Sequence, residues 1–228
     1  MPGTFTLVLE TSTPHASLAT IQPDGKIEQC DFTSDRSHNA VLFSPLQELL
    51  DARSSTEIGW VLVGSGPGSY SGTRVGIAAA QGVAIAAGCP AVALPSILAV
   101  PSAENGSACL AIGDARRGSF WTAMIEHSQL HAAPELTDAA GLEVIVSATI
   151  AAGIPVISLE DTTRFPLSPE LLEQVRLECP DATRLWNVWK SSDSETRKQW
   201  MAEPPQPIYL KPPHITPAKR PWWLPPQS

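Results

Sequence analysis

The stretch Gly64-Ser65-Gly66-Pro67-Gly68-Ser69-Tyr70-Ser71-Gly72-Thr73-Arg74-Val75-Gly76 decides the fold, because it joins a short apolar strand to a long apolar helix. Glycine allows a positive φ and a close approach by other groups. The amides that begin the following helix point outward and favour an anion. Two phosphate-binding patterns nevertheless fail. The run has no lysine for G-x-x-x-x-G-K-[ST], and Ser69 and Ser71 stand where G-x-G-x-x-G needs its last glycine. A packing turn and a phosphate cradle both remain open.

Strands and helices alternate on either side of this turn. Hydrophobic periodicity and turn residues predict strands at 5–10, 15–21 and 26–32, a helix capped by Ser37, a strand at 60–63, a helix at 73–87, a strand at 90–94, a hairpin of 108–114 and 119–126, a strand at 154–159 and a helix at 171–177. This order predicts an α/β fold of two lobes, residues 1–103 and a smaller lobe of residues 104–228. Nine prolines from Pro204 onward predict an extended tail.

Composition narrows the class of protein. Of the 228 residues 43% are hydrophobic and 17% charged, which is typical of a globular chain. No run of apolar residues is long enough to span a membrane, and the opening residues lack a basic leader, so we expect a soluble cytoplasmic protein. The four cysteines lie far apart, which argues against a disulfide framework. The net charge of −8 disfavours direct binding of nucleic acid.

The helix after the glycine-rich turn has a ridge of very small side chains. They recur at every fourth position, at Gly72, Gly76, Ala80, Ala84 and Gly88. Only Arg74 and Gln81 are strongly polar between residues 73 and 87. A helix that is apolar all round is buried, and small residues let a second helix approach closely. The pattern does not distinguish a partner's helix from packing within this chain.

Four segments together resemble one protein family. GPGSYSGTRVG, residues 66–76, resembles the signature GPGS[FY]TG[LV]R[IV]G of the TsaB family, also called YeaZ. LVLETS (7–12), DARRGSFW (114–121) and PIYLK (207–211) resemble three further family segments, in the family's order. The likeness therefore spans residues 7 to 211, most of the chain.

The resemblance implies two actin-like lobes of the ASKHA or ribonuclease H-like kind, with mixed sheets flanked by helices. It implies a role in making N6-threonylcarbamoyladenosine at position 37 of tRNA. In that role the chain is the non-catalytic partner of a TsaD-like transferase, joined by a TsaE-like ATPase. Contact with tRNA, and binding of ATP or ADP, are then expected only within the complex. A homodimer through the same surface is the expectation where the partner is missing.

The resemblance also assigns residues. The pairing surface comprises the helix before the glycine-rich turn and the helix after it, through Leu42, Leu46, Leu49, Gly72, Arg74, Gly76, Ala80 and Ala84. A phosphate turn kept only in shape comprises Glu10, Thr11, Ser12, Gly66, Gly68 and Ser69. Asp114, Arg116 and Arg117 form a hairpin tip, either a partner contact or a solvated turn.

The alternative is a nucleotide- or metal-dependent enzyme of the same superfamily, a transferase or a glycoprotease-like peptidase. Catalytic relatives carry a His-x-x-x-His pair after the next strand, where residues 94–100 have no histidine. His127 and His131 have that spacing, but they follow a strand pattern and we expect loop residues without a metal. Glu10, where the family usually has aspartate, keeps the alternative open.

The tail pair Trp222-Trp223 either docks on a partner or folds back on this chain.

Overall fold

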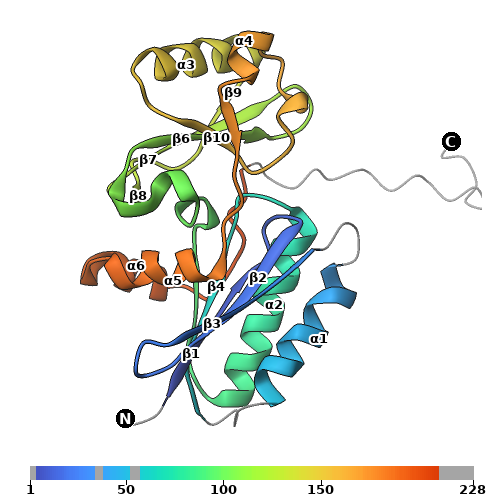
Figure 1. Cartoon of the computed structure of the whole chain (residues 1–228), viewed down its shortest axis with the longest axis vertical. Coiled ribbons are helices and arrows are strands. Elements are labelled where there is room, and N and C mark those ends of the chain that lie inside the picture. The colour runs from blue at the N-terminus through green and yellow to red at the C-terminus, as the bar shows by residue number, and fades with distance from the viewer. Residues whose placement is uncertain (1–3, 34–37, 52–56, 211–228) are drawn as a thin grey trace, which may run out of the picture.

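The computed structural model describes residues 4–33, 38–51 and 57–210, without the side chains of residues 38–40 and 105 (Figure 1). Two lobes lie one above the other along the long axis, each built around one sheet. The predicted cap Ser37, Lys211 of the fourth family segment and the Trp222-Trp223 pair fall outside the described residues.

The first lobe is built on a sheet of five strands. These are β1 (Phe5–Glu10), β2 (His15–Ile21), β3 (Ile27–Thr33), β4 (Ile58–Gly64) and β5 (Ala91–Leu94), in the order β3-β2-β1-β4-β5. The first three strands are antiparallel neighbours, whereas β4 runs parallel to both β1 and β5. Helices α1 (His38–Asp51) and α2 (Tyr70–Ala87) cover one face. With both faces covered, β1 is buried at all six positions, which explains why its successive residues Leu7, Val8 and Leu9 are all apolar.

The second lobe repeats this strand order. Its strands are β6 (Cys109–Asp114), β7 (Phe120–Glu126), β8 (Gln129–Leu130), β9 (Glu135–Thr137), β10 (Val156–Ser158) and β11 (Val175–Leu177). Read from its other edge, as β8-β7-β6-β10-β11, the order matches β3-β2-β1-β4-β5 of the first sheet strand by strand. Strand β9 is an extra strand paired to β7. The helical elements of this lobe and of the crossing to it are η2 (Ser96–Leu98), η3 (Pro101–Gly106), α3 (Ala139–Ala151), η4 (Thr162–Arg164) and α4 (Pro169–Leu172).

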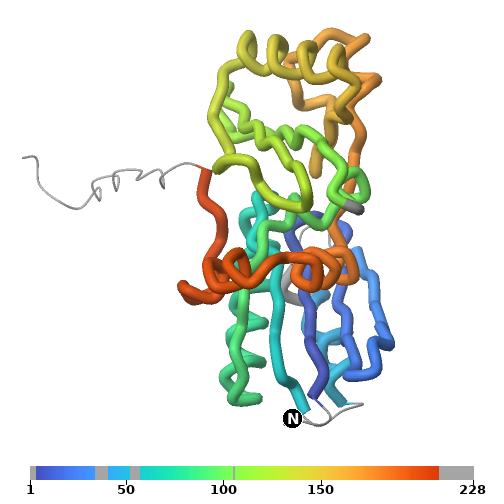
Figure 2. Tube along the Cα trace, turned by 90° about the vertical axis from the view of Figure 1, so that its left-hand side faces the viewer, coloured from blue at the N-terminus to red at the C-terminus, as the bar shows by residue number. Residues whose placement is uncertain are grey.

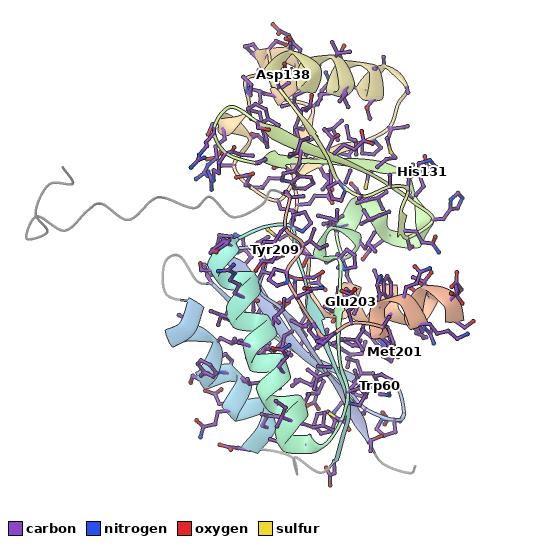
Figure 3. The ribbon with its side chains drawn as sticks, turned by 180° about the vertical axis from the view of Figure 1, so that it is seen from behind. Trp60, His131, Asp138, Met201, Glu203 and Tyr209 are labelled. Carbon is purple, nitrogen blue, oxygen red and sulfur yellow. The ribbon has the colours of Figure 1, made fainter. Side chains whose placement is uncertain are left out.

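The chain then returns to the first lobe. Helices α5 (Ala182–Ser191) and α6 (Ser194–Met201) pack against the face of the first sheet that α1 and α2 leave uncovered (Figure 2). Trp189 anchors them, with its ring centroid 5.7 Å from that of Trp60 and 6.3 Å from that of Trp200. Figure 3 shows Trp60 on this side, close to Met201. The division at residue 103 stays a prediction, although these two helices lie on the first sheet.

One of the hydrophobic clusters contains residues of both lobes. Val8 and Leu62 on one face of the first sheet share a cluster with Ala111 and Ile157 of the second. Residues one position away, such as Leu7 and Val61, face α1 and α2 instead, as the two-residue period of a strand requires. The lobes are therefore held together by shared packing as well as by the connecting chain.

The predicted architecture, two α/β lobes with mixed sheets flanked by helices, is confirmed. The helix expected at 171–177 is wrong in its second half, because 175–177 is strand β11 beside β10. The α2 helix begins at Tyr70, earlier than expected, because the Ser69 hydroxyl accepts a hydrogen bond from the Gly72 amide and caps it. No helix in the described parts of the chain has the length and apolar character needed to cross a membrane.

Candidate functional site

The glycine-rich turn packs directly on the turn between β1 and β2. The Ser69 amide donates to the Ser12 carbonyl at 2.6 Å, and a Cβ on Gly68 would lie 2.3 Å from the same oxygen. The Thr11 hydroxyl donates to the Gly72 carbonyl at 2.9 Å. The structure therefore brings together the two turns that were assigned to phosphate, but they bind each other. Gly66, with φ of 85°, supplies the left-handed residue that this packing turn needs.

Glu10 lies beneath this pair of turns and faces the core. Its side chain is fully buried, with Oε1 accepting a hydrogen bond from the Ser12 amide at 2.7 Å. The other oxygen, Oε2, has no hydrogen-bond partner among the described residues. A Cβ on Gly64 would lie 1.9 Å from that oxygen, so only glycine leaves room for the carboxyl group. Burial raises the pKa of Glu10, and its hydrogen bonds to Ser12 offset only part of that rise.

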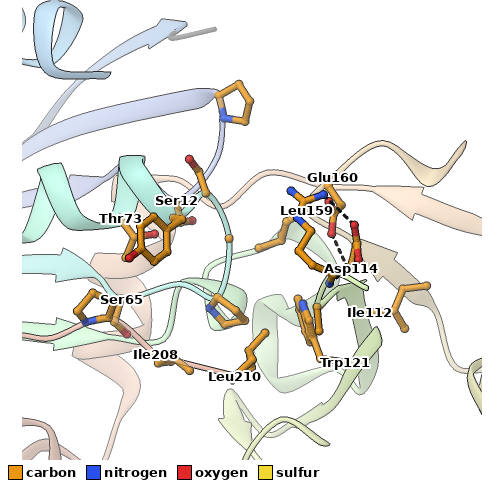
Figure 4. A pocket seen from close by; sticks show the side chains of 18 of the residues that line it. Ser12, Ser65, Thr73, Ile112, Asp114, Trp121, Leu159, Glu160, Ile208 and Leu210 are labelled. Carbon is orange, nitrogen blue, oxygen red and sulfur yellow. Dashed lines mark hydrogen bonds and ion pairs between the residues drawn. The ribbon is translucent and has the colours of Figure 1, made fainter. Parts of the chain in front are cut away.

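A cavity of about 1110 Å³ opens between the lobes beside these turns (Figure 4). The first lobe supplies hydroxyl-bearing residues, among them Ser12, Ser69 and Thr73. The second lobe supplies Trp121 and Leu159. Glu10 is not among the lining residues, and no group of three or more His, Cys, Asp or Glu with metal-binding geometry occurs in the described chain.

The segment before the end of the described chain forms a further wall of the cavity. The Ile208 amide donates to the Ser65 carbonyl at 2.9 Å, and Gln81 Nε2 donates to the Pro205 carbonyl at 3.1 Å. Arg74 Nη2 donates to the Tyr209 hydroxyl at 2.8 Å. We call residues 204–210 the C-terminal strap. Its non-helical path agrees with the extended tail that was predicted, and Figure 3 places Tyr209 near the junction of the lobes.

The hairpin tip also lies at the cavity. Asp114 accepts hydrogen bonds from the Arg116 amide at 2.6 Å and from Arg116 Nη1 at 2.8 Å. The Asp114 amide donates to Glu160 Oε1 at 2.6 Å. Arg116 and Arg117 have positive φ angles of 68° and 60°, which are strained for residues with side chains. Asp114 and Arg116 line the cavity, whereas Arg117 is exposed outside its lining.

The small-residue ridge faces the protein's own sheet. Gly72, Gly76, Ala80 and Ala84 are all buried, and a Cβ on Gly76 would lie 2.1 Å from the Thr11 hydroxyl. Leu42 and Leu46 are buried in the same cluster, with Leu49 packed at its edge. The six buried residues face the interior and do not form a partner surface, so their assignment is wrong, whereas the assignments of the partly buried Leu49 and the exposed Arg74 stay predictions. Small side chains are needed here because α2 lies close to β1 and β4.

The opposite face of α2 is exposed and apolar. Ile85 is 82% exposed and Phe43 on the adjacent α1 is 54% exposed. Ala78, Gly82 and Ala86 lie exposed on α2 between or beside them. We call these five residues the outer helix face. The sequence missed it because a helix that is apolar all round was expected to be buried all round.

The histidine pair does not lie on a helix. His127 is in the turn after β7 with a φ of 52°, and both His127 and His131 are exposed. Figure 3 shows His131 at the outer edge of the second lobe. This agrees with the expectation of loop histidines.

Comparisons with known proteins identify the family of this chain. The family model described as "TsaD: tRNA N6-adenosine threonylcarbamoyltransferase" matches residues 33–173, more than half of the chain. The tRNA threonylcarbamoyladenosine biosynthesis protein TsaB of Escherichia coli (strain K12) is 30% identical over 129 residues. The chain belongs to the TsaD family. The match to the Escherichia coli protein covers 54% of this chain and 55% of that protein, so the chain spans about half the length of this curated relative.

Solved structures share the fold of this chain. YeaZ from Pseudomonas aeruginosa aligns with a TM-score of 0.66 at 22% identity, over 91% of this chain and 100% of that one. A Pseudomonas aeruginosa protein described as similar to the peptidase YeaZ aligns with a TM-score of 0.69 at 23% identity, with the same coverage. At these identities the likeness concerns the fold alone.

Proposed function

We propose that this chain is a non-catalytic partner subunit of a TsaD-type transferase that makes N6-threonylcarbamoyladenosine at position 37 of tRNA. Membership of the TsaD family and the likeness to TsaB of Escherichia coli support this role. In this proposal a TsaE-like ATPase joins the complex, which also supplies any contact with tRNA and any binding of ATP or ADP.

The single observation that carries the proposal is the outer helix face. Ile85 exposes most of its side chain, and a Cβ on Gly82 would meet no atom within 4 Å, so the surface is open at its centre. None of its five residues is charged. Interface cores are depleted of charge, so exposed apolar residues on two neighbouring helices suit a contact with another protein.

A catalytic role is less well supported, because the feature that favoured it does not reach the cavity. Glu10 is fully buried, and Gly64 and Ser96 occupy the space next to its free oxygen. The β1–β2 turn is held against the glycine-rich turn by the Ser69–Ser12 hydrogen bond. The acid therefore serves the packing of the first lobe.

Reconstitution tests the function. The host's TsaD-like and TsaE-like proteins, tRNA and the substrates of the transferase are mixed with and without this chain, and the modified nucleoside is measured by mass spectrometry. We expect modification only with the chain present. Equal modification without it would refute the proposal, and modification by this chain in the absence of the TsaD-like protein would show that it is itself the enzyme.

The surface is tested separately by mass. Light scattering of the isolated chain is compared with that of Phe43→Ser, a change at a side chain that is 54% exposed. We expect a dimer that becomes a monomer in the variant, because the outer helix face pairs with itself when the transferase is missing. A dimer unaffected by Phe43→Ser would place self-association elsewhere.

A further inference from the structure

The cavity between the lobes has large apolar side chains that solvent can reach. Leu177, on the edge strand β11, is 60% exposed, and Ile208 and Leu210 of the C-terminal strap are half-buried. We call these three residues, with Trp121 and Leu159 of the second lobe, the apolar wall. Figure 4 shows Ile208 and Leu210 along one edge of the cavity and Leu159 across from them. At about 1110 Å³ the cavity has room for a pair of aromatic side chains.

Charged side chains of both signs line the same cavity. Two of its three acids, Asp114 and Glu160, have arginine partners on the lining. The third, Asp161, is exposed and makes no ion pair with any described residue. Arg74 of the first lobe also lacks an ion pair in the described chain, and its guanidinium lies 3.7 Å from the centre of the Tyr70 ring. A ligand with a positive group beside the second lobe therefore finds a carboxylate there that is not neutralised.

The tail, residues 211–228, differs from the rest of the chain in charge. It contains Lys211, Lys219 and Arg220 and neither Asp nor Glu. When its charge of +3 is taken from the −8 of the whole chain, residues 1–210 carry a net charge of −11. Opposite charges attract over about 8 Å at physiological ionic strength. The sequence thus joins a basic tail to an acidic body.

The same tail carries the tryptophan pair. In Lys219-Arg220-Pro221-Trp222-Trp223-Leu224, two basic side chains stand directly before a proline and three large apolar side chains. The described chain ends at Leu210, which lines the cavity, and Trp222 follows 12 residues later. An extended chain of that length spans up to about 40 Å, so the pair can turn back into the cavity. Three of residues 221–226 are prolines, which have no amide proton to satisfy on burial.

We propose that residues 219–224 of this chain bind in the cavity between its own lobes. Trp222-Trp223 pack against the apolar wall, and Lys219-Arg220 lie toward Asp161. The C-terminal strap holds the start of the tail at the cavity, because the Ile208 amide donates to the Ser65 carbonyl at 2.9 Å. The chain thereby supplies its own occupant for the cavity. This inference does not depend on the proposed partner role.

A cysteine of the cavity lining tests where the tail lies. Cys179 is half-buried there, whereas the half-buried Cys30 and Cys89 lie outside the lining. The full chain with Trp223→Cys is oxidised with diamide, and its disulfides are mapped by mass spectrometry. We expect a bond to Cys179 and none to the other two cysteines. The matched control is Gln227→Cys, which has a longer tether and is expected to react with Cys179 at least tenfold more slowly.

Two outcomes of this experiment would overturn the proposal. Equal rates for Trp223→Cys and Gln227→Cys would mean that the tail passes the cavity by chance. A mixture of isotope-labelled and unlabelled chains separates bonds within one chain from bonds between copies. A bond to Cys179 found only between two copies would place the tail on a second molecule.

A competition experiment measures the same contact as an affinity. The probe is a fluorescein-labelled peptide of residues 216–226, and its receptor is the full chain with Trp222→Ser and Trp223→Ser. We expect saturable binding to this variant and at least tenfold weaker binding to the unaltered chain, because its own tail competes at the high effective concentration of a tether. Equal affinities for the two chains would overturn the proposal. Binding of the peptide to the host's TsaD-like protein alone would make the tail a partner segment instead.

Further substitutions in that receptor test the site on the body. At low salt we expect Leu177→Glu to strengthen binding of the basic peptide about threefold and Leu177→Lys to weaken it by a similar factor. Leu177 is 60% exposed, so neither change endangers the fold. The control is Val144→Ser, at an apolar residue of α3 that is 68% exposed and outside the cavity lining, and we expect no change in affinity. Loss of binding in this control, or equal affinities for the two Leu177 variants, would refute the site.

Discussion

The two lobes share one strand order but differ in the hairpin that joins their first two strands. In the first lobe this hairpin turn is buried, with Glu10 facing the core and lacking a partner for one oxygen. In the second lobe the corresponding acid is Asp114, which lines the cavity and pairs with Arg116. The same position in the same topology therefore holds a packing group in one lobe and an accessible, charge-paired group in the other.

The helices that connect β4 to β5 in the first lobe and β10 to β11 in the second lobe differ in length. The α2 helix has 18 residues, whereas α4 has four. A long helix packed through small residues gives the first lobe a stable outer surface, and the short α4 leaves the second lobe's strand ends beside the cavity. In the proposed role, the first lobe supplies the partner contact, whereas the second lobe supplies side chains to the cavity.

The largest expected effect on the free energy of unfolding is that of a substitution at Gly64, the residue that makes the burial of Glu10 possible. In Gly64→Ala the new Cβ would lie 1.9 Å from Glu10 Oε2 and 2.5 Å from Ser96 Oγ. We expect a loss of about 3 kcal/mol in the free energy of unfolding, the upper range for overpacking. Urea denaturation measures it. The matched control is Gly82→Ala, where no atom lies within 4 Å and we expect a gain of about 0.5–1 kcal/mol. Equal effects at the two glycines would contradict the packing of the first lobe.

Glu10 gives the first lobe a pH dependence of stability. Burial raises its pKa above the ordinary value of 4.5, so in the pH range above 4.5 the unfolded chain loses this proton while the folded protein keeps it. The folded state then binds more protons, and the contribution of Glu10 to stability falls as pH rises through that range. We expect Glu10→Gln to flatten this fall and to be the more stable protein at neutral pH. Thermal melting from pH 4 to pH 8 measures both, and a steeper curve for the variant would contradict the assignment.

At Asp114 the expected effect is smaller. Asp114→Ala removes the hydrogen bond to the Arg116 amide and an ion pair whose arginine side chain is 67% exposed. Exposed pairs contribute little, so we expect a loss of about 1 kcal/mol or less in the free energy of unfolding. A loss as large as that of Gly64→Ala would show that the second hairpin is also a packing element.

The smallest effect on the free energy of unfolding is expected for substitutions at Arg117. Its φ of 60° favours glycine, so Arg117→Gly relieves strain at some cost in chain entropy. We expect a net gain of about 0.5 kcal/mol by chemical denaturation. Arg117→Ala keeps the strain and is the control, with an expected change near zero. A destabilised Arg117→Gly would mean that the side chain itself holds the hairpin.

Much of this architecture could be predicted from the sequence, because the relevant signals are local. The glycine-rich turn, the hairpins and the lobe order follow from turn residues and periodicity. Helix α5 could also have been found, since its buried residues Ala182, Leu185, Val188 and Trp189 have helical spacing.

The rest depends on contacts between distant residues. The apolar pattern of α2 does not say which side meets the sheet, so the buried ridge and the exposed Ile85 could not be told apart. The inward direction of Glu10 depends on the space left by Gly64. The bond between Arg74 and Tyr209 joins residues 135 positions apart, and no local pattern predicts it.

The most direct test of the central claim is the affinity of this chain for the host's TsaD-like protein, measured by calorimetry with one arginine substitution in each lobe. Ile85 on α2 and Val144 on α3 are 82% and 68% exposed, so both variants are expected to fold. We predict that Ile85→Arg weakens the complex at least a hundredfold, because it places a charge in the centre of the outer helix face, and that Val144→Arg leaves the affinity unchanged. Equal affinities for the two variants, or no complex with the unaltered chain, would contradict the account.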